Sequence, residues 1–225
     1  MRLVLMGPPG AGKGTQAKRL AEEFGLLHLS SGDIFRAERA TGSELGKKLA
    51  EYMDAGELVP DDIVVDVMAK AMTDDGAEQG LLLDGFPRTV AQAEALDREL
   101  EKLSSPLDGV LVITADDDAI VQRITGRRSC PDCGRVYHMQ FMPPAEDEQC
   151  DDCGTKLIQR EDDTESVVRQ RLDNYKRQTE PVIRYYRERS RASVVEVDGN
   201  PAPDEVTAAL TQAVRKLSSQ DESKA

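Results

Sequence analysis

The sequence predicts an α/β fold, in which helices cover both faces of a parallel five-stranded sheet. Short, nearly continuous apolar runs recur along the chain, and segments with apolar residues at helical spacing separate them. Continuous apolar strands are typical of parallel sheets that are buried on both faces. Alternation of strands and helices is typical of the connections that parallel strands require. The predicted strands, of which the second is the weakest, are Leu3–Met6, Leu26–Leu29, Leu81–Leu83, Val110–Ile113 and Val194–Val197.

Apolar residues at helical spacing predict the helices. They predict helices over Ala17–Phe24, Ile63–Met72, Val90–Leu103 and Val206–Leu217. A longer helical pattern, Val167–Tyr186, contains Pro181. Proline lacks an amide N–H and its ring clashes with the preceding turn, so we expect this helix to be kinked or split.

Two segments interrupt the alternation of strands and helices. Residues 30–59 predict short helices without a strand, and residues 126–163 lose helical periodicity and contain all four cysteines. We therefore expect both to be excursions from a core made of residues 1–29, 60–125 and 164–217. The polar segment 218–225 is expected to be a flexible tail.

The composition restricts the class of ligand. The 225 residues carry 29 Lys and Arg against 42 Asp and Glu, a formal net charge of −13. Such a charge repels nucleic acid and anionic membranes, so we expect neither as a partner. Basic residues nevertheless gather at Arg123, Arg127 and Arg128 and at Arg160 and Arg171, which favours a small polyanion. No apolar run approaches the roughly 20 residues that span a bilayer, and no signal peptide is evident, so we expect a cytoplasmic protein.

Directly after the first predicted strand, the chain reads Gly7-Pro8-Pro9-Gly10-Ala11-Gly12-Lys13-Gly14-Thr15. A glycine-rich loop between a strand and a helix turns backbone N–H groups toward an anion, and the helix N-terminus adds partial positive charge. The spacing is that of a phosphate-binding loop (P-loop), whose lysine reaches the outer phosphates. Gly14 departs from the general pattern, which has Ser or Thr directly after the lysine. The loop predicts a nucleoside triphosphate site.

The four cysteines are spaced as in a four-thiolate zinc site. Cys130 and Cys133 form one C-x-x-C pair, and Cys150 and Cys153 form the second. A closed set of four sulfurs leaves no position for water, so the predicted metal is structural; iron suits the same geometry. Two disulfides or free thiols are the alternatives, and reduced thiols in the cytosol disfavour the disulfides. A nucleic-acid-binding ribbon is disfavoured by the acidic residues around the cysteines, Asp132, Glu146, Asp147, Glu148, Asp151 and Asp152.

A second polar segment follows the third predicted strand. Asp84 ends this strand near the P-loop, which is a suitable position for holding hydrated Mg²⁺. Arg88 could clamp a phosphate, and Gln92 offers both a donor and an acceptor to an adenine edge. Other candidate phosphate clamps are Arg36, Arg123, Arg127, Arg160 and Arg171. His28 and His138 are expected to be structural or exposed.

Together these residues resemble the adenylate kinase family, in its long form with a four-cysteine site in the lid. Gly7–Thr15 is similar to the family's P-loop, including the glycine between Lys13 and Thr15. Asp84–Gln92 is similar to its second signature. Ser30–Arg36 resembles the start of its monophosphate-binding lobe, where Ser31 replaces the more usual threonine. The resemblance extends over essentially the whole chain.

The resemblance implies two nucleotide sites. The implied ATP contacts are Gly10, Ala11, Gly12, Lys13, Gly14, Thr15, Arg123, Arg127, Val136, Tyr137 and Pro201. The implied AMP contacts are Ser31, Arg36, Met53, Glu57, Leu58, Val59, Gly85, Phe86, Pro87, Arg88, Gln92, Arg160 and Arg171. It also implies a cis Phe86–Pro87 bond, an AMP-binding lobe over residues 30–59 and a zinc-bearing lid over residues 126–163.

The implied reaction is reversible phosphoryl transfer from MgATP to AMP, which gives two ADP. The implied catalytic residues are Lys13, Asp84, Arg88, Arg123, Arg160 and Arg171. A phosphate acceptor is already an anion, which agrees with the lack of a convincing general base in the sequence. The alternatives are another donor or acceptor, such as GTP with AMP or a pyrimidine monophosphate, and a nucleotide-gated zinc-ribbon regulator. A monomer is implied by the resemblance alone.

Overall fold

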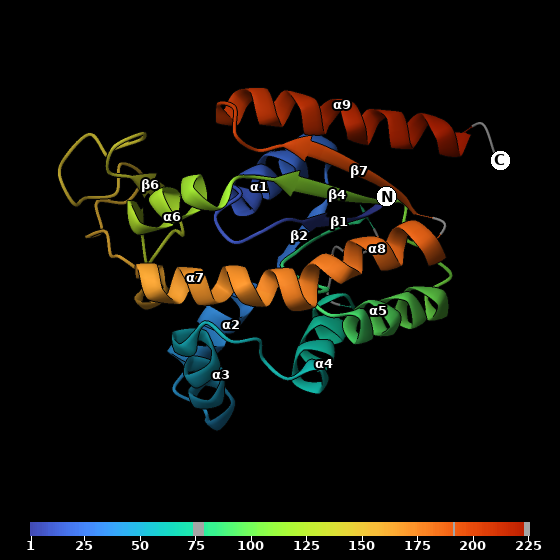
Figure 1. The fold of residues 1–225 in the computed structure, drawn as a ribbon, viewed down its shortest axis with the longest axis horizontal. Helices are drawn as coiled ribbons and strands as arrows, with labels where there is room; N and C mark the ends of the chain where they lie inside the picture. Colours follow the sequence, from blue (N-terminus) through green and yellow to red (C-terminus); the bar gives the residue numbers. More distant parts are fainter. Residues whose placement is uncertain (74–78, 191, 223–225) are drawn as a thin grey trace.

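The computed structural model describes residues 1–73, 79–190 and 192–222. Within them, a parallel five-stranded sheet has the order β2-β3-β1-β4-β7 (Figure 1). The predicted α/β fold and its strands are confirmed. In chain order the strands are β1 (Arg2–Met6), β2 (Leu27–Ser30), β3 (Leu81–Asp84), β4 (Gly109–Thr114) and β7 (Ser193–Asp198).

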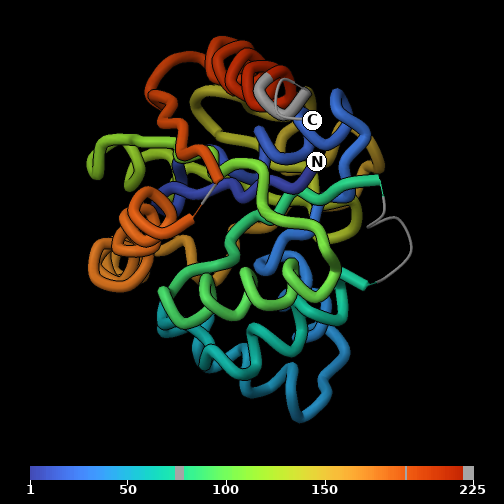
Figure 2. Tube along the Cα trace, turned by 90° about the vertical axis from the view of Figure 1, so that its right-hand side faces the viewer, coloured from blue at the N-terminus to red at the C-terminus, as the bar shows by residue number. Residues whose placement is uncertain are grey.

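The sheet contributes to two separate cores because successive side chains of a strand point to opposite faces. In β1, Leu3 and Leu5 join one apolar cluster, whereas Val4 and Met6 join the other. The first cluster is covered by α1 (Lys13–Phe24) and α9 (Pro203–Glu222). The second is covered by α4 (Asp61–Ala71), α5 (Val90–Lys102) and α8 (Glu180–Arg189). Figure 2 shows the same layers end-on, with α9 in red on one side of the sheet.

The carboxyl ends of three neighbouring strands lie side by side. In the strand register, Asp84 at the end of β3 pairs with Leu5 of β1 and with Ser30 of β2. The P-loop follows β1, and helix α2 (Ser31–Ala40) follows β2 directly. Ligands of open parallel sheets bind beyond this edge of the sheet. The fold therefore brings the P-loop, the segment after Asp84 and the start of α2 together.

The first excursion is helical, as predicted. Helices α2 and α3 (Glu44–Ala55) pack against each other at one end of the molecule (Figure 1). The Oγ of Ser43 accepts a hydrogen bond from the Gly46 N–H at 2.9 Å and caps α3. Gly56 ends α3 in the left-handed region at φ 70°, which a glycine adopts without strain.

The second excursion contains a short antiparallel hairpin that the sequence did not predict. Strands β5 (Arg127–Ser129) and β6 (Val136–His138) pair within it. It follows α6 (Asp117–Thr125), a helix that the apolar pattern did not single out. In Figure 1 the hairpin and its loops lie at the left of the view, next to α6.

Pro181 splits its helix as predicted. Helix α7 (Glu165–Asn174) is followed by a π-helical turn at Tyr175–Thr179, and α8 begins one residue before the proline. A wider turn accommodates the proline ring, which an unbroken α-helix would not.

Part of the segment predicted as a tail is helical. Helix α9 continues to Glu222, and Ser218 Oγ bonds back to the Val214 carbonyl at 3.2 Å. The apolar stripe of α9 ends at Leu217, which packs in the cluster on the sheet. The helix extends beyond this residue through its backbone hydrogen bonds. Residues 223–225 of the predicted tail lie outside the described residues. None of the described helices is long and apolar enough to cross a membrane.

Truncation of a central strand residue should destabilise the fold. Leu82 on β3 is 0% exposed in the cluster under α1 and α9, so Leu82→Ala should lower the free energy of unfolding by about 2–5 kcal/mol. Leu103 is 46% exposed, so Leu103→Ala should cost less than about 1 kcal/mol. Urea unfolding of both variants measures the difference, and equal losses would contradict this account of the core.

Candidate functional site

The P-loop glycines hold a backbone shape that other residues do not adopt. Gly7, Gly10 and Gly12 all have positive φ, at 144°, 77° and 92°. A Cβ on Gly7 would lie 2.3 Å from the Ile113 carbonyl oxygen, so the loop lies directly on β4. Gly12 precedes α1 and offers no side-chain cap, which leaves the first N–H groups of the helix for an anion.

Lys13 lies at the start of α1 and folds back over the loop. Its Nζ donates to the carbonyl oxygens of Gly7 and Pro8, both at 2.8 Å. Burial, opposed by the Asp84 carboxylate and assisted by the charges of Arg88 and Arg171, lowers the pKa of Lys13 to about 8. A bound anion would relieve the cost of holding this cation.

Asp84 faces the first turn of α1. A Cβ on Gly14 would lie 3.8 Å from Asp84 Oδ2, and that oxygen is 3.6 Å from His28 Nε2. His28 Nε2 is buried and has no hydrogen-bond partner among the described residues. A carboxylate at this position is a ligand that suits hydrated Mg²⁺. Beyond Asp84, the Phe86–Pro87 bond is cis, which confirms that prediction.

A pocket beside the P-loop collects most of the residues predicted to bind AMP. It opens between α2, the end of α3, the segment after β3 and α7. The predicted residues that line it are Lys13, Ser31, Arg36, Met53, Glu57, Leu58, Val59, Gly85, Pro87, Arg88, Gln92 and Arg171. Phe86, another implied AMP contact, is 2% exposed, packs in the core and is not part of this lining. Arg160 is not part of this lining.

Hydrogen bonds fix the backbone and side chain of Arg88. Its N–H donates to Gln92 Oε1 at 2.7 Å, its Nε donates to the Gly85 carbonyl at 2.7 Å, and its carbonyl accepts from Thr179 Oγ1 at 2.9 Å. Ser31 Oγ donates to the same Gly85 carbonyl at 2.7 Å. Burial and the neighbouring Arg171 lower the pKa of Arg88 to about 10. The guanidinium is thus held in place at the pocket.

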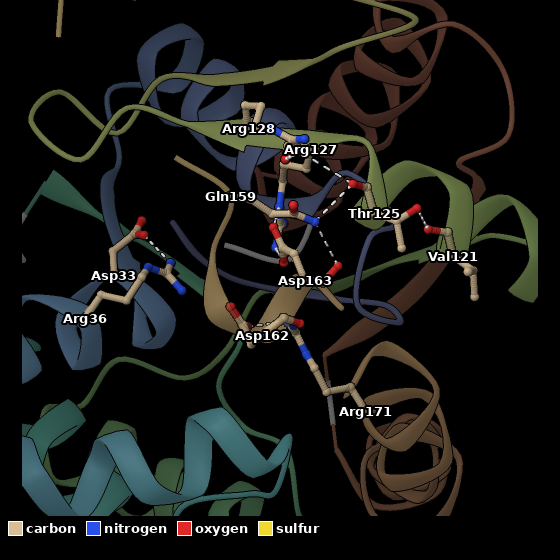
Figure 3. A network of polar contacts seen from close by, with 10 residues as sticks. All are labelled: Asp33, Arg36, Val121, Thr125, Arg127, Arg128, Gln159, Asp162, Asp163 and Arg171. Atoms are coloured by element: carbon tan, nitrogen blue, oxygen red, sulfur yellow. Dashed lines mark hydrogen bonds and ion pairs between the residues drawn. The ribbon is translucent and has the colours of Figure 1, made fainter. Parts of the chain in front are cut away.

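Further arginines surround the turn that holds Asp162 and Asp163 (Figure 3). Arg171 Nη1 donates to Asp162 Oδ2 at 2.6 Å, and Arg127 Nε donates to Asp163 Oδ2 at 2.9 Å. Burial, followed by the charges of Arg127 and other arginines, lowers the pKa of Arg160 to about 10. Cations this close together favour a multiply charged anion between them.

Three of the implied ATP contacts, Arg123, Tyr137 and Pro201, do not line the pocket. Arg123 donates to the carbonyls of Gly199 and Asn200 at 2.9 and 3.1 Å, in the loop that leads to the exposed Pro201. Tyr137 is 1% exposed; its hydroxyl accepts from the Asp151 N–H at 2.7 Å and lies 3.4 Å from Cys150 Sγ. A nucleotide could therefore meet Tyr137 only through its backbone, because the side chain supports the cysteine cluster.

The four cysteines converge as predicted, and no disulfide joins them. Their sulfur atoms all lie within 4.8 Å of one another, and the shortest separation is 3.4 Å between Cys130 and Cys153. Tetrahedral zinc with bonds near 2.3 Å places sulfurs about 3.8 Å apart, so the cluster fits this ion. Gly134 and Gly154, at φ 70° and 71°, end the two knuckles with matching N–H bonds to the carbonyls of Cys130 and Cys150.

Sequence reasoning missed several polar residues of the site. Asp162 and Asp163 neutralise Arg171 and Arg127, Asp61 holds Gln92 and Thr179 holds Arg88. The only available signal for Asp162 and Asp163 was their position two and three residues after Arg160. Nothing local to Asp61 or Thr179 predicts their contacts, which join segments 31 and 91 residues apart in the chain.

The lowered pKa of Lys13 predicts a pH dependence of stability. The folded value is about 8 and the ordinary value is 10.5, so between these values the unfolded chain binds more protons. The Lys13 contribution to stability should therefore rise as the pH increases through this range. Without ligand, the free energy of unfolding of the wild type relative to Lys13→Met should increase from pH 7.5 to pH 10. Urea unfolding across this range is the measurement, and a constant difference would contradict the assignment.

Comparison with known proteins identifies the family. The family model for adenylate kinase matches residues 5–191. The adenylate kinase of Archaeoglobus fulgidus is 47% identical over 219 residues, which cover 97% of this chain and all of that protein. The adenylate kinase of Methanocella arvoryzae is 48% identical, over 96% of this chain and 100% of that protein. The adenylate kinase of a Thermoanaerobacter species is 50% identical, over 92% of this chain and 94% of that protein. The chain belongs to the adenylate kinase family, whose members transfer phosphoryl groups between adenine nucleotides.

Proposed function

We propose that this enzyme transfers the terminal phosphoryl group of MgATP to AMP, giving two molecules of ADP. The observation that carries the proposal is the pocket beside the P-loop. It contains a clamped arginine, Arg88, and an amide, Gln92, that can read a base. In this proposal the P-loop supplies the donor site, and the pocket supplies the acceptor site.

The donor side is built on Gly10–Thr15. Their backbone N–H groups and the N-terminus of α1 would hold the triphosphate, with Lys13 at its outer phosphates. Asp84 would hold Mg²⁺ through its water ligands, and the ion would neutralise charge on the donor's phosphate oxygens. Arg123, Arg127, Val136, Tyr137 and Pro201 complete the proposed ATP site. The contacts at Tyr137 and Pro201 would be made by the backbone.

The acceptor side is built on the pocket. Gln92 and the apolar Met53 and Val59 would hold adenine, and Arg36, Arg88 and Arg171 would hold the phosphate of AMP. Leu58 and the Glu57 backbone would close the site around the ribose and base. In this assignment Asp33 and Asp162 neutralise Arg36 and Arg171 until the phosphate arrives.

Catalysis would rest on positioning and charge neutralisation. The acceptor oxygen of a phosphate needs no general base, because it is already an anion near neutral pH. Lys13, Arg88, Arg123, Arg160 and Arg171 would surround the transferred group, where each fixed cation stabilises charge that develops in the transition state. Loss of one such contact typically costs about 10²–10³ in rate.

Water is the competing acceptor, so the site has to close. We propose that residues 126–163 form a lid and residues 30–59 an AMP-binding lobe, which move against a core of residues 1–29, 60–125 and 164–217. Arg39 of α2 pairs both with Asp54 of α3 and with Glu161 at the end of the lid, so the proposed lobe and lid are in contact here. Closure would exclude water and assemble the arginines. We further propose that the enzyme is a cytoplasmic monomer.

Zinc would be held by Cys130, Cys133, Cys150 and Cys153. The apolar cluster of described residues in this lobe consists of two of these cysteines with Tyr137 and Leu157. So small a core does not hold a lobe together without a metal. The ion would keep the lid a single rigid body, and would take no part in the chemical step.

A panel of donors and acceptors tests the proposed reaction. Phosphoryl transfer should be faster from ATP to AMP than from ATP to GMP, UMP or CMP, and faster than from GTP to AMP. Anion-exchange chromatography of the products measures each rate. Lys13→Met should fold normally and lose about 10²-fold or more of the rate. Faster transfer with another pair would replace the proposed substrates. Slow hydrolysis with no acceptor dependence would support a nucleotide-gated regulator, and wild-type turnover by Lys13→Met would exclude the role of Lys13.

Removal of the metal should lower stability while sparing the catalytic groups. Protein purified without chelator should contain about one zinc ion per chain, and a strong chelator should lower its melting temperature by several degrees. Cys133→Ser with Cys153→Ser should show the lower melting temperature with or without chelator. Calorimetry and metal analysis measure both effects, and a metal-free wild type with an unchanged melting temperature would contradict the structural role.

A further inference from the structure

The side-chain amide of Gln92 lies between one group that can only donate a hydrogen bond and another that can only accept one. Gln92 is 1% exposed on α5. Its Oε1 accepts from the Arg88 N–H at 2.7 Å, and its Nε2 donates to Asp61 Oδ1 at 2.7 Å. A backbone N–H only donates and a carboxylate oxygen only accepts. The chemistry of these two neighbours therefore determines which end of the amide is oxygen and which is nitrogen.

Asp61 is itself held in place. Thr89 Oγ1 donates to Asp61 Oδ2 at 3.0 Å and accepts from the Gln92 N–H at 3.1 Å. Together with the bond from Gln92 Nε2, these contacts form a closed ring of three residues. Asp61 also begins α4, directly after Pro60, where the partial positive charge of the helix N-terminus favours a carboxylate. The ring joins the first turns of α4 and α5.

Each end of the Gln92 amide keeps one bonding position for a ligand. An amide nitrogen has two N–H donors and its oxygen has two lone pairs, and one of each is used within the protein. Gln92 also lines the pocket proposed for the acceptor base. The pocket thus presents a donor from Nε2 and an acceptor from Oε1, in a fixed order. Adenine offers the matching pair, an N1 acceptor and an N6 donor, whereas 6-oxopurines offer an N1–H donor and an O6 acceptor.

We propose that Asp61 is a specificity-determining positioning residue, which holds the Gln92 amide in the orientation that accepts adenine and rejects hypoxanthine and guanine. This inference rests on the proposed function, because it takes AMP as the acceptor. Rotation of the amide by half a turn would suit a 6-oxopurine. It would also place Gln92 Oε1 against the Asp61 carboxylate and Nε2 against the Arg88 N–H, and both contacts are repulsive.

The matched variants are Asp61→Asn and Asp62→Asn. An asparagine at position 61 can present either a donor or an acceptor to Gln92, so one of the two obstacles to rotation disappears. Asp62 is the next residue of the same helical turn, is exposed, and shares no hydrogen bond with Gln92. Its replacement removes the same charge from the same helix terminus and leaves the ring intact.

The readout is the ratio of kcat/KM for AMP to kcat/KM for IMP, with ATP as donor. Asp61→Asn should lower this ratio by about ten-fold or more, which is the effect of one charged hydrogen bond. Most of the change should appear in the KM values, and IMP should gain relative to AMP. Asp62→Asn should keep the wild-type ratio. Calorimetric titration of AMP and IMP into each protein without ATP provides the same ratio independently of phosphoryl transfer.

The outcomes separate the inference from the proposed function. Equal losses for AMP and IMP in Asp61→Asn would make Asp61 a structural residue and overturn the inference. A wild type that does not prefer AMP to IMP would overturn the proposed substrate instead. If Asp61→Asn does not fold, nuclear magnetic resonance of the wild type decides. A scalar coupling across the hydrogen bond from Gln92 Nε2 to the side-chain carboxyl carbon of Asp61 is expected, and a Gln92 Nε2 group that shows no coupling to Asp61 would overturn the inference.

Discussion

Accumulation of positive charge at one edge of the sheet is the constraint on which the site depends. Lys13, Arg88 and Arg171 are each held where burial and the other cations lower their pKa values. Such an arrangement is costly in the free protein and becomes favourable when phosphates lie between the cations. The neighbouring carboxylates offset part of this cost, and they have to be displaced or bridged when a nucleotide binds. The protein thus stores unfavourable electrostatic energy where its ligand carries most charge.

The sheet makes this concentration of charge possible. The carboxyl ends of its parallel strands lie at one edge, so the segments that follow them meet there although they are distant in the chain. The alternating apolar residues of β1, β3 and β4 secure that edge from both faces. Packing of the helices on the sheet therefore stabilises the fold, and the segments at this edge can hold buried cations that are individually destabilising.

Much of the fold and part of the site could be predicted from the sequence. The apolar runs predicted every strand of the central sheet, and the spacing of Cys130, Cys133, Cys150 and Cys153 predicted their convergence. These features are visible because they are periodic or local. The hairpin of β5 and β6 has no apolar period, so it was missed. The bonds of Asp61 and Thr179 join surfaces that only the packed structure brings together, and no local pattern encodes such contacts.

The two cysteine knuckles have a consequence for how the lobe is assembled. Each knuckle closes through its own backbone hydrogen bonds, from Cys130 to Arg135 and from Cys150 to Thr155. The backbone hydrogen bonds that shape each knuckle are thus made within that knuckle. Between the knuckles, Tyr137 packs beside the cysteines and its hydroxyl lies 3.4 Å from Cys150 Sγ, whereas residues 145–149 are exposed. Over evolution, this exposed stretch is free to change in composition while Tyr137 and the cysteine centre stay the same.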